Sequence, residues 1–523
     1  MIAITAASIA LAILFASIIL SLAFAVYGLN TLYLTIKARR YRQVSPAPLA
    51  SRPSVAIHLP IYNEFYVVGR LLGSCAGMAR KYGADKVKIY VLDDSTDETS
   101  SEVDRLASEY SAQGLCLRVI RRGNRKGFKA GALQTALLGT EEKYVAVFDA
   151  DFVPSCDFLD RTVAVLEEDP KVGFVQARWG HLDRNHNAIT MSIAIGIDAH
   201  FFLEQQGRNG SGYLMNFNGS AGVLRADVIR EAGGWESDTL AEDLDLSYRI
   251  QLAGYRGVYL SDLEVPGEVP PTIASLKRQQ GRWARGSLQA ARKLRGRILG
   301  SERLSLGQKV EAGMHLTYYL VHPLMVASFL LAVAADFMSI DVIRYGIALS
   351  VPTFSTAPGS TGVVMETVQV VPWLVFSALV ILSTFAVLIC CFQAVRAQKL
   401  GPLVNIKRIV FLVALGYGMS ISNSVHALNG LLSSETGTFS RTPKYAVLET
   451  SEDWRDKKYQ IPLNATTLLE GAAVGLAGTA SAWAIFTGNL GILPILLVYL
   501  AGYAVILYLT ARQRLGSGGK RDS

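Results

Sequence analysis

The stretch YVAVFDAD, Tyr144–Asp151, decides the fold. Its first five residues are largely apolar and include β-branched valines, which is typical of a buried parallel strand. Asp149 and Asp151 end the stretch, and side chains two apart on an extended backbone point the same way. Ligands bind outside the carboxyl ends of strands in an open α/β sheet, and paired carboxylates there can hold a hard divalent cation. The stretch therefore predicts a Mg²⁺ or Mn²⁺ site, with an aspartate-rich turn as the simpler alternative.

Upstream of this stretch, predicted strands alternate with predicted helices. The strands are VAIHLPIYNE from Val55, KIYVLDD up to Asp94, and LRVIRR, Leu117–Arg122. Such alternation implies a parallel sheet with right-handed crossovers. Asp93 and Asp94 end the second strand and would face the same crevice as the Asp149 pair. They equally suit a capping run for the helix that follows, because Ser, Thr and Asp come next.

A nucleotide would explain these acidic strand ends together. A carboxylate at Asp93 or Asp94 can accept a hydrogen bond from the imide N–H of a uracil-like base. A diphosphate needs a cation, and Lys129 could add a point charge to a phosphate. The sequence contains neither GxGxxG nor GxxxxGK[ST], which excludes dinucleotide-binding and P-loop classes.

A second acidic group lies further along, in GGWESDTLAEDLDLSYRI. Glu242, Asp243 and Asp245 open a predicted amphipathic helix, where acids are favoured by the helix dipole in any case. The functional interpretation is a general base within reach of an acceptor hydroxyl. One such carboxylate suffices for an inverting displacement at a sugar.

A basic amphipathic helix is predicted over Thr272–Ile298. Most of its arginines and lysines suit a membrane surface. Gln279, Arg282 and Trp283 are less ordinary, because a tryptophan offers a flat platform to a sugar ring and an arginine can bind pyrophosphate bidentately.

The composition indicates a membrane protein. Half of the 523 residues are hydrophobic, the mean hydropathy is +0.29, and the formal charge is +8. Ile2–Ile36 holds no charge and is long enough to span a bilayer. Basic residues cluster beside apolar spans, so we expect them to face anionic lipid and not nucleic acid. The five cysteines lack zinc-ligand spacing and predict no disulfide framework.

The topology follows from the positions of lysine and arginine. Lys37, Arg39, Arg40 and Arg42 follow the first span, which predicts an N-terminus outside and a cytoplasmic domain next. Further apolar runs occupy about 312–338, 368–395, 404–432, 466–487 and 490–511. If all crossed, the basic tail would lie outside. We therefore expect 404–432, with its Ser, Asn, His and Gly, to lie at the interface or along a cavity wall.

The motifs in their order resemble a known family. DDS, DAD, AED and QQGRW resemble the D, D, D, QxxRW signature of membrane-embedded, processive family-two glycosyltransferases with the GT-A fold. NRKGFKAGAL, VQARW, FNGSAGV and EDLDLSYR read like the cellulose-synthase-like glucan and mannan synthases. The resemblance spans roughly residues 55–286. Ala241 departs from the usual Thr before Glu-Asp, which leaves the identity of the sugar open.

The resemblance implies roles for individual residues. Asp93 and Asp94 would bind the nucleoside, Lys129 the donor, Asp149 and Asp151 the diphosphate and metal, and Asp243, beside Glu242, would be the base. Gln279, Arg282 and Trp283 would hold the pyrophosphate and the acceptor end. GTFSRTPKY resembles the family's gating loop, whose positions here are Phe439, Arg441, Thr442 and Lys444.

The expected organisation is an α/β GT-A (Rossmann-like) cytoplasmic domain plus a helical transmembrane domain. Its parts are a span at 1–36, a linker at 37–54, the GT-A domain at 55–271, an interface helix at 272–300, membrane and interface helices at 310–511 with a gating-like loop at 433–463, and a basic tail at 512–523.

The expected function is an inverting β-glycosyltransferase (a hexosyltransferase) in the plasma or cell membrane. It would extend a polysaccharide from UDP-glucose or GDP-mannose and translocate it. The alternatives are a non-processive transferase acting on a lipid or polyprenyl phosphate, and a transporter that senses nucleotide sugars.

Overall fold

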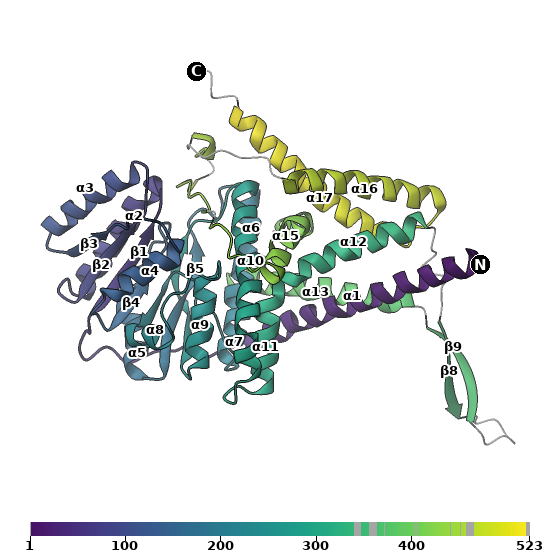
Figure 1. Cartoon of the computed structure of the whole chain (residues 1–523), viewed down its shortest axis with the longest axis horizontal. Coiled ribbons are helices and arrows are strands. Elements are labelled where there is room, and N and C mark those ends of the chain that lie inside the picture. Colours follow the sequence, from purple (N-terminus) through teal and green to yellow (C-terminus); the bar gives the residue numbers. More distant parts are fainter. Residues whose placement is uncertain are drawn as a thin grey trace.

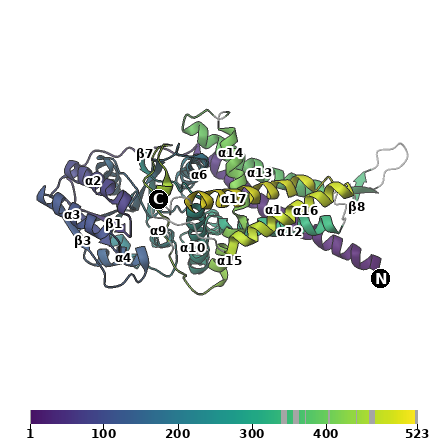
Figure 2. The ribbon, with the colours of Figure 1, turned by 90° about the horizontal axis from the view of Figure 1, so that it is seen from above.

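The computed structural model describes residues 2–338, 347–354, 363–370, 372–401, 403, 405–439, 441–449, 451–456 and 465–518. An α/β domain lies at one end of the molecule, and long helices extend away from it (Figure 1). Seen from above, the N-terminus lies at the far end of these helices (Figure 2). The expected fold class, an α/β domain joined to apolar helices, is confirmed.

The first half of the α/β domain is a parallel sheet. The strands β1 to β4 pair in the order β3-β2-β1-β4, and all neighbours run parallel. Their bounds are β1 (Val55–Ile61), β2 (Val87–Asp93), β3 (Cys116–Ile120) and β4 (Tyr144–Val147). The helices between them are α2 (Phe65–Tyr82), α3 (Thr99–Ala112) and α4 (Phe128–Leu138). The parallel sheet predicted from the alternation of strands and helices is thus confirmed.

The second half of the sheet is mixed. The strand order continues β4-β6-β5-β7, and β6 runs antiparallel to both of its neighbours. β5 and β7 pair parallel to each other. The bounds are β5 (Val172–His181), β6 (Gly222–Arg225) and β7 (Arg256–Gly267), with α5 (Phe158–Glu168), α8 (Ala226–Glu231) and α9 (Glu242–Leu252) beside them. Between β5 and β6 the chain leaves the sheet through α6 (Ala188–Ala199), η1 (His200–Gln205) and α7 (Gln206–Gly210).

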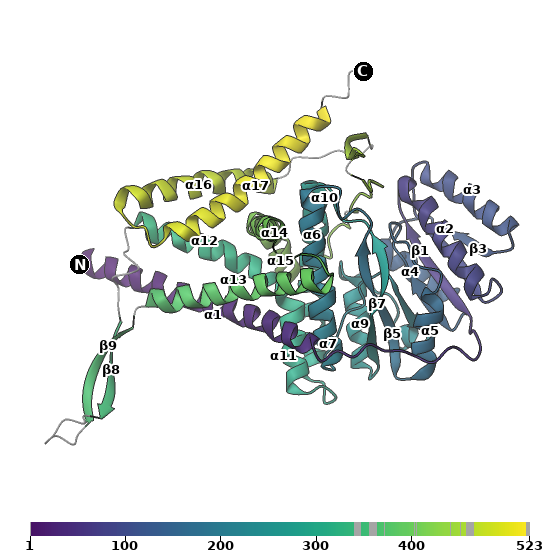
Figure 3. The same ribbon diagram turned by 180° about the vertical axis from the view of Figure 1, so that it is seen from behind.

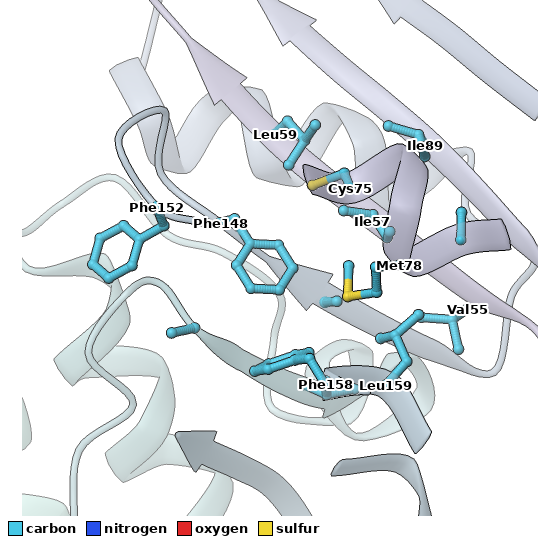
Figure 4. Packing of buried hydrophobic residues seen from close by; sticks show 14 of the residues in the cluster. Val55, Ile57, Leu59, Cys75, Met78, Ile89, Phe148, Phe152, Phe158 and Leu159 are labelled. Carbon is cyan, nitrogen blue, oxygen red and sulfur yellow. The ribbon is translucent and has the colours of Figure 1, made fainter. Parts of the chain in front are cut away.

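The domain has a core on each face of the sheet, one of them between the sheet and α2 and α5 and the other against α4, α8 and α9. Val55, Ile57 and Leu59 alternate along β1 and are fully buried. Figure 4 shows them beside Cys75 and Met78 of α2, with Phe148 to the left and Phe158 lower in the view. Burying each such side chain contributes about 1.5–3 kcal/mol. This packing fixes the ends of β1 and β4, where the acidic side chains emerge.

The helix α10 (Ile273–Leu299) joins the two parts of the molecule. Thr272 caps it, since its side chain accepts a hydrogen bond from the Ser275 backbone N–H. α10 approaches its neighbours closely through glycine. A Cβ on Gly286 would lie 2.7 Å from the Ala241 backbone nitrogen, just before α9. This close approach holds α10 against the start of α9.

Four described helices are long and apolar enough to cross a membrane. Their apolar segments are Ala12–Ala38 in α1 (Ile2–Ala38), Leu306–Phe337 across α11 (Leu306–Thr317), η2 (Tyr318–Leu320) and α12 (Val321–Phe337), Ala465–Thr487, which is α16, and Leu493–Leu515 in α17 (Leu493–Gly518). The helices α14 (Ile406–Gly418) and α15 (Ser420–Leu432) together form a pair bent by 52°, either a broken span or a re-entrant segment. That pair coincides with the run expected not to cross.

The helix α13 (Pro372–Ala397) lies beside α1 (Figure 3). A Cβ on Gly28 would lie 2.7 Å from the Ser383 Cα, so glycine permits this contact. Its apolar segment Ile381–Ala397 is shorter than the four above. The strands β8 (Ile347–Phe354) and β9 (Val363–Val370) form an antiparallel hairpin, which the sequence analysis did not anticipate.

Candidate active site

Side chains from separate segments converge on a cavity of about 50 Å³ at the carboxyl ends of β4 and β5. Its walls come from α4, the loop after β4, the start of α9 and the turn after β7. One face of α10 and the side chain of Lys444 complete them. Most of the residues predicted from the sequence meet here: Lys129, Asp149, Asp151, Glu242, Asp243, Gln279, Arg282, Trp283 and Lys444.

Asp149 lies at the open side of the cavity. Its Oδ1 lies 2.6 Å from the Lys129 Nζ, and about a third of its side chain (35%) is exposed. The Lys129 ammonium also donates to the Gly219 carbonyl at 2.9 Å. Lys129 therefore ties the Asp149 carboxylate to the glycine-rich turn before β6.

Asp151 is almost fully buried, at 1% exposure. Its Oδ2 accepts hydrogen bonds from the Lys444 ammonium at 2.8 Å and from the Glu268 backbone N–H at 2.9 Å. Its Oδ1 has no hydrogen-bond partner among the described residues. A buried carboxylate oxygen without a partner is costly.

These two carboxylates fit a divalent cation. Asp149 is accessible, Asp151 has a free oxygen, and oxygen ligands are what Mg²⁺ and Mn²⁺ require. The ammonium groups of Lys129 and Lys444 now neutralise the charges that a cation would neutralise.

A second acidic cluster has metal-like spacing but a different role. Glu236, Asp238 and Asp245 bring their carboxylate oxygens close together. The Lys293 ammonium already lies 2.5 Å, 2.7 Å and 3.1 Å from their oxygens, respectively. This cluster is therefore an ion-pair network that ties α9 to α10.

Glu242 and Asp243 are the first residues of α9. A Cβ on Gly219, whose φ is +77°, would lie 2.5 Å from the Asp243 Oδ2, so only glycine leaves room for this carboxylate. Burial raises the pKa of Asp243, although Lys129 opposes the shift. Burial likewise raises the pKa of Glu242 to about 7, again opposed by Lys129. A carboxyl group with a raised pKa is a better proton acceptor near neutral pH.

The motif residues of α10 face the same cavity. Gln279 is 6% exposed, and its Oε1 has no partner among the described residues. The Arg282 guanidinium lies over the Phe439 ring, 4.8 Å from its centroid. Trp283 also lines the cavity. An amide, a guanidinium and an indole thus face the two acidic groups from the opposite wall.

The segment 437–446 lies across the site. Phe439 stacks on Phe128 with ring centroids 5.8 Å apart, and Arg441 pairs with Glu64 at 2.8 Å. Thr442 is buried, and Lys444 pairs with Asp151. The predicted gating positions therefore all pack near the cavity. Residues 440, 450 and 457–463 of the expected loop at 433–463 lie outside the described residues.

Asp93 and Asp94 do not line this cavity. The Asp93 Oδ2 accepts from Arg121 at 2.8 Å, and its Oδ1 from the Ser95 backbone N–H at 3.0 Å. The Asp94 carboxylate accepts from the Arg122 Nε at 3.0 Å. Their proposed contact with a nucleoside stays a prediction.

Four further side chains with hydrogen-bonding groups, which the sequence did not identify, line the cavity: Trp179, His181, Asn218 and Glu268. The Trp179 indole donates to the Ser220 carbonyl at 3.3 Å, and the His181 Nε2 lies 2.8 Å from the Asp198 Oδ1. Trp179 and Asn218 fall within the motifs VQARW and FNGSAGV. Glu268 follows β7 directly, which is a strand-end signal of the kind that identified Asp149.

Comparison with known families agrees with this geometry. Residues 144–419, more than half of the chain, match the family described as "Glycosyl transferase family group 2". The chain belongs to this family of glycosyltransferases, and the family resemblance predicted from the sequence is confirmed.

The individual relatives are plant enzymes. Glucomannan 4-beta-mannosyltransferase 9 of Arabidopsis thaliana is 37% identical over 262 residues, which is 49% of this chain and 49% of that protein. Glucomannan 4-beta-mannosyltransferase 1 of Oryza sativa subsp. japonica is 32% identical over 396 residues, 71% of this chain and 74% of that protein. The match spans about half the length of the first of these relatives.

Part of the chain is also similar to a solved structure. The mannosyltransferase PcManGT from Pyrobaculum calidifontis, in complex with GDP-Man and Mn²⁺, is 24% identical. The match covers 62% of this chain and 87% of that one, with a TM-score of 0.48.

Proposed function

We propose that this chain is a membrane-embedded, inverting β-glycosyltransferase that extends a polysaccharide from a nucleotide sugar, with GDP-mannose as the first candidate donor. The names of its relatives support mannose as the sugar, because both plant proteins are called glucomannan 4-beta-mannosyltransferases. UDP-glucose is the other donor that the sequence left open.

One observation carries the proposal. The Asp149 and Asp151 pair, the Asp243 carboxylate and Trp283 line one cavity, although they come from three separate elements. An inverting transfer needs a diphosphate site, a base and an acceptor platform within the length of one sugar. The cavity provides a candidate for each of these.

The proposed reaction is a single displacement. The Asp243 carboxylate takes the proton of an acceptor hydroxyl, and the oxygen forms a bond to the anomeric carbon of the donor sugar. The bond from that carbon to the diphosphate oxygen breaks, and the nucleoside diphosphate leaves with the electron pair. Lys129 and Arg282 stabilise the negative charge on the leaving group.

A Mg²⁺ or Mn²⁺ ion, when bound, supplies further positive charge to the leaving diphosphate. Asp149 and Asp151 would hold it. We also assign Asp93 and Asp94 to the nucleoside, in a donor-bound arrangement that frees them from Arg121 and Arg122.

The segment 437–446 has to move for the donor to bind. A cavity of about 50 Å³ is far smaller than the roughly 300–1,000 Å³ of typical ligand pockets. Lys444 occupies the Asp151 carboxylate, and Phe439 covers Arg282. We infer that this segment acts as a gate over the site.

The apolar helices support a membrane location. We propose that α1, α12, α13, α16 and α17 cross the plasma or cell membrane, with the N-terminus outside and the α/β domain inside. The bent pair α14–α15 would lie at the interface without crossing the membrane. The acceptor would be the end of the saccharide itself.

A donor panel tests the proposal. Purified full-length protein in lipid nanodiscs is incubated with Mn²⁺ and GDP-mannose, UDP-glucose or UDP-N-acetylglucosamine, and nucleoside diphosphate release is measured. We expect release from GDP-mannose, dependent on added saccharide acceptor and lost in Asp243→Asn. Release from none of the donors, with or without acceptor, would contradict the proposal.

A further inference from the structure

A second cavity, of about 320 Å³, lies on the other side of Arg282. Its walls come from α10, α15, α16 and α17, together with Leu240 and Thr438. Arg282 lines both cavities, so the two are neighbours that share one guanidinium group. Apart from Arg282, no residue that the proposed reaction uses lines this second cavity.

The charge of this cavity is strongly positive. Lys277, Arg278, Arg282 and Arg285 line it, and no aspartate or glutamate is among its lining residues in the described part of the chain. Lys277 is already compensated, because its ammonium lies 2.5 Å from the Glu470 carboxylate and both side chains are buried. Three arginines remain, and their spacing of four and three residues places them on one face of α10.

Arg278 and Arg285 have no acidic partner among the described residues, whereas Arg282 also interacts electrostatically with the Glu242 and Asp243 carboxylates. Arg278 has no hydrogen bond or ion pair to any described residue. Arg285 donates to the neutral Glu435 carbonyl at 2.8 Å, and Arg282 stacks on Phe439. The Nε atoms of Arg282 and Arg285 are buried without a partner among the described residues. Grouping guanidinium groups without anions in a partly buried site is unfavourable.

Neutral polar groups complete the lining. Ser422, Thr438, Thr467 and Thr510 lie around the cavity, although the Thr510 hydroxyl already donates to the Ile506 carbonyl at 2.8 Å, and His426 packs directly on Gly281. A Cβ on Gly281 would lie 2.5 Å from the His426 ring, so the helix leaves no side chain between them. Arginines surrounded by hydroxyl groups are the setting in which proteins bind phosphate oxygens.

The position of the cavity is at the boundary of the apolar helices. Thr467 is close to the first residue of α16, and Thr510 lies toward the last residues of α17. These are the ends of two candidate spans that face the α/β domain (Figure 1). A phosphate at this level is available from two sources, a lipid headgroup or the solution.

We propose that the cavity between α10 and the ends of α16 and α17 is an anion site that binds a phosphate group through Arg278, Arg282 and Arg285. A neutral glycan could satisfy the hydrogen bonds of these groups but would leave their charge uncompensated. The site adjoins the candidate diphosphate site through Arg282 but extends beyond it, because Arg278 and Arg285 line only the larger cavity. The proposal goes beyond the transfer reaction and does not depend on the identity of the donor.

Binding measurements on the full-length protein test this site. In phosphatidylcholine nanodiscs, inorganic phosphate and pyrophosphate are titrated by calorimetry. In parallel, retained phosphatidylglycerol is quantified by native mass spectrometry after reconstitution with and without that lipid. The test variant is Arg278→Gln/Arg285→Gln. The matched control is Arg295→Gln/Arg297→Gln, which removes two exposed arginines from the same helix, outside the cavity.

We expect the test variant to bind the occupying probe at least about tenfold more weakly, because it removes two charged donors from the site. The control should bind like the wild type. If the test variant loses only phosphatidylglycerol binding, the site binds a lipid headgroup. If it loses only phosphate or pyrophosphate binding, the site binds a soluble anion. The proposal is overturned if the wild type binds neither probe, or if test and control variants lose binding equally. Arg278→Gln alone replaces the double variant if melting curves show the latter unfolded.

Discussion

The Lys444 ammonium lies 2.8 Å from the Oδ2 of Asp151, although 293 residues separate them in the sequence. The contact joins the segment after α15 to the acidic strand end that a divalent cation would occupy. Lys444 also lies near Glu64 and Glu268. The side chains of these two acids and of Asp151 are buried, so the Lys444 ammonium compensates part of their negative charge. The lysine and a bound cation would thus be alternative partners of one carboxylate.

Lys444→Met should therefore increase the affinity for Mn²⁺. The substitution removes the competing ammonium and leaves the Asp151 carboxylate free for the ion. We expect the Kd for Mn²⁺, measured by electron paramagnetic resonance without donor, to fall by about tenfold, the equivalent of 1.4 kcal/mol.

Lys171→Met is the control for this measurement, because Lys171 is exposed and lies at the start of β5 away from the cavity. It should leave the Kd unchanged. An unchanged or weaker Mn²⁺ affinity in Lys444→Met would show that the lysine does not compete with the metal.

Asp243→Asn should separate donor binding from transfer. The amide keeps the shape of the side chain but cannot accept the proton of the acceptor hydroxyl. We expect transfer to fall by about 10²–10⁴-fold, as for loss of a general base, with donor affinity retained. Product formation and fluorescent GDP binding are measured side by side, and Asp227→Asn, an exposed aspartate on α8, serves as control. Full transfer by Asp243→Asn would refute its role.

The rate should also depend on pH in a defined direction. Burial raises the pKa of Asp243, and raises that of Glu242 to about 7. A base acts only when ionised, so transfer should be maximal above the pKa of the pair and fall about tenfold per pH unit below it. The acid limb should lie above the pKa of an ordinary aspartate, about 3.9. A pH–rate profile that stays flat down to about pH 4 would contradict this assignment.

Much of the catalytic domain could be predicted because its signals are local. The valines before Asp149 define a buried strand, and the order of strands and helices defines the parallel half of the sheet. The acids of α9 and the motif of α10 were found because helix starts and rare tryptophans are visible in a sequence.

Other features depend on long-range packing that no local pattern reports. The antiparallel direction of β6 follows from how the chain returns through α6 to α7. Asp93 and Asp94 were grouped with Asp149 by strand position, but Arg121 and Arg122 hold them in ion pairs outside the cavity. Glu268 and Lys444 meet Asp151 only through tertiary folding.

Trp283→Ala should shorten the product if the enzyme is processive. An aromatic platform for the terminal sugar is worth about 0.5–1.5 kcal/mol beyond burial, by analogy with aromatic pairs. Its loss slows each extension step, while donor hydrolysis by water is spared. Product length is measured by gel and mass spectrometry. An unchanged length distribution with a lower rate would remove Trp283 from the acceptor site.

The proposed topology can be tested with single cysteines in a cysteine-free background. Ser451 lies in the loop after α15, and Thr487 ends α16; both are exposed. An impermeant thiol reagent added to intact cells should label Thr487→Cys and spare Ser451→Cys. Labelling of Ser451→Cys with protection of Thr487→Cys would mean that the α14–α15 pair crosses the membrane.

The central claim is tested most directly by the product itself. Purified protein is incubated with radiolabelled GDP-mannose, Mn²⁺ and a short β-mannan acceptor, and the product is sized before and after digestion with an endo-β-mannanase. The account predicts a labelled β-linked polymer that the enzyme digests and that Asp243→Asn does not make. A product of one sugar on a lipid, or no transfer from GDP-mannose or UDP-glucose, would contradict it.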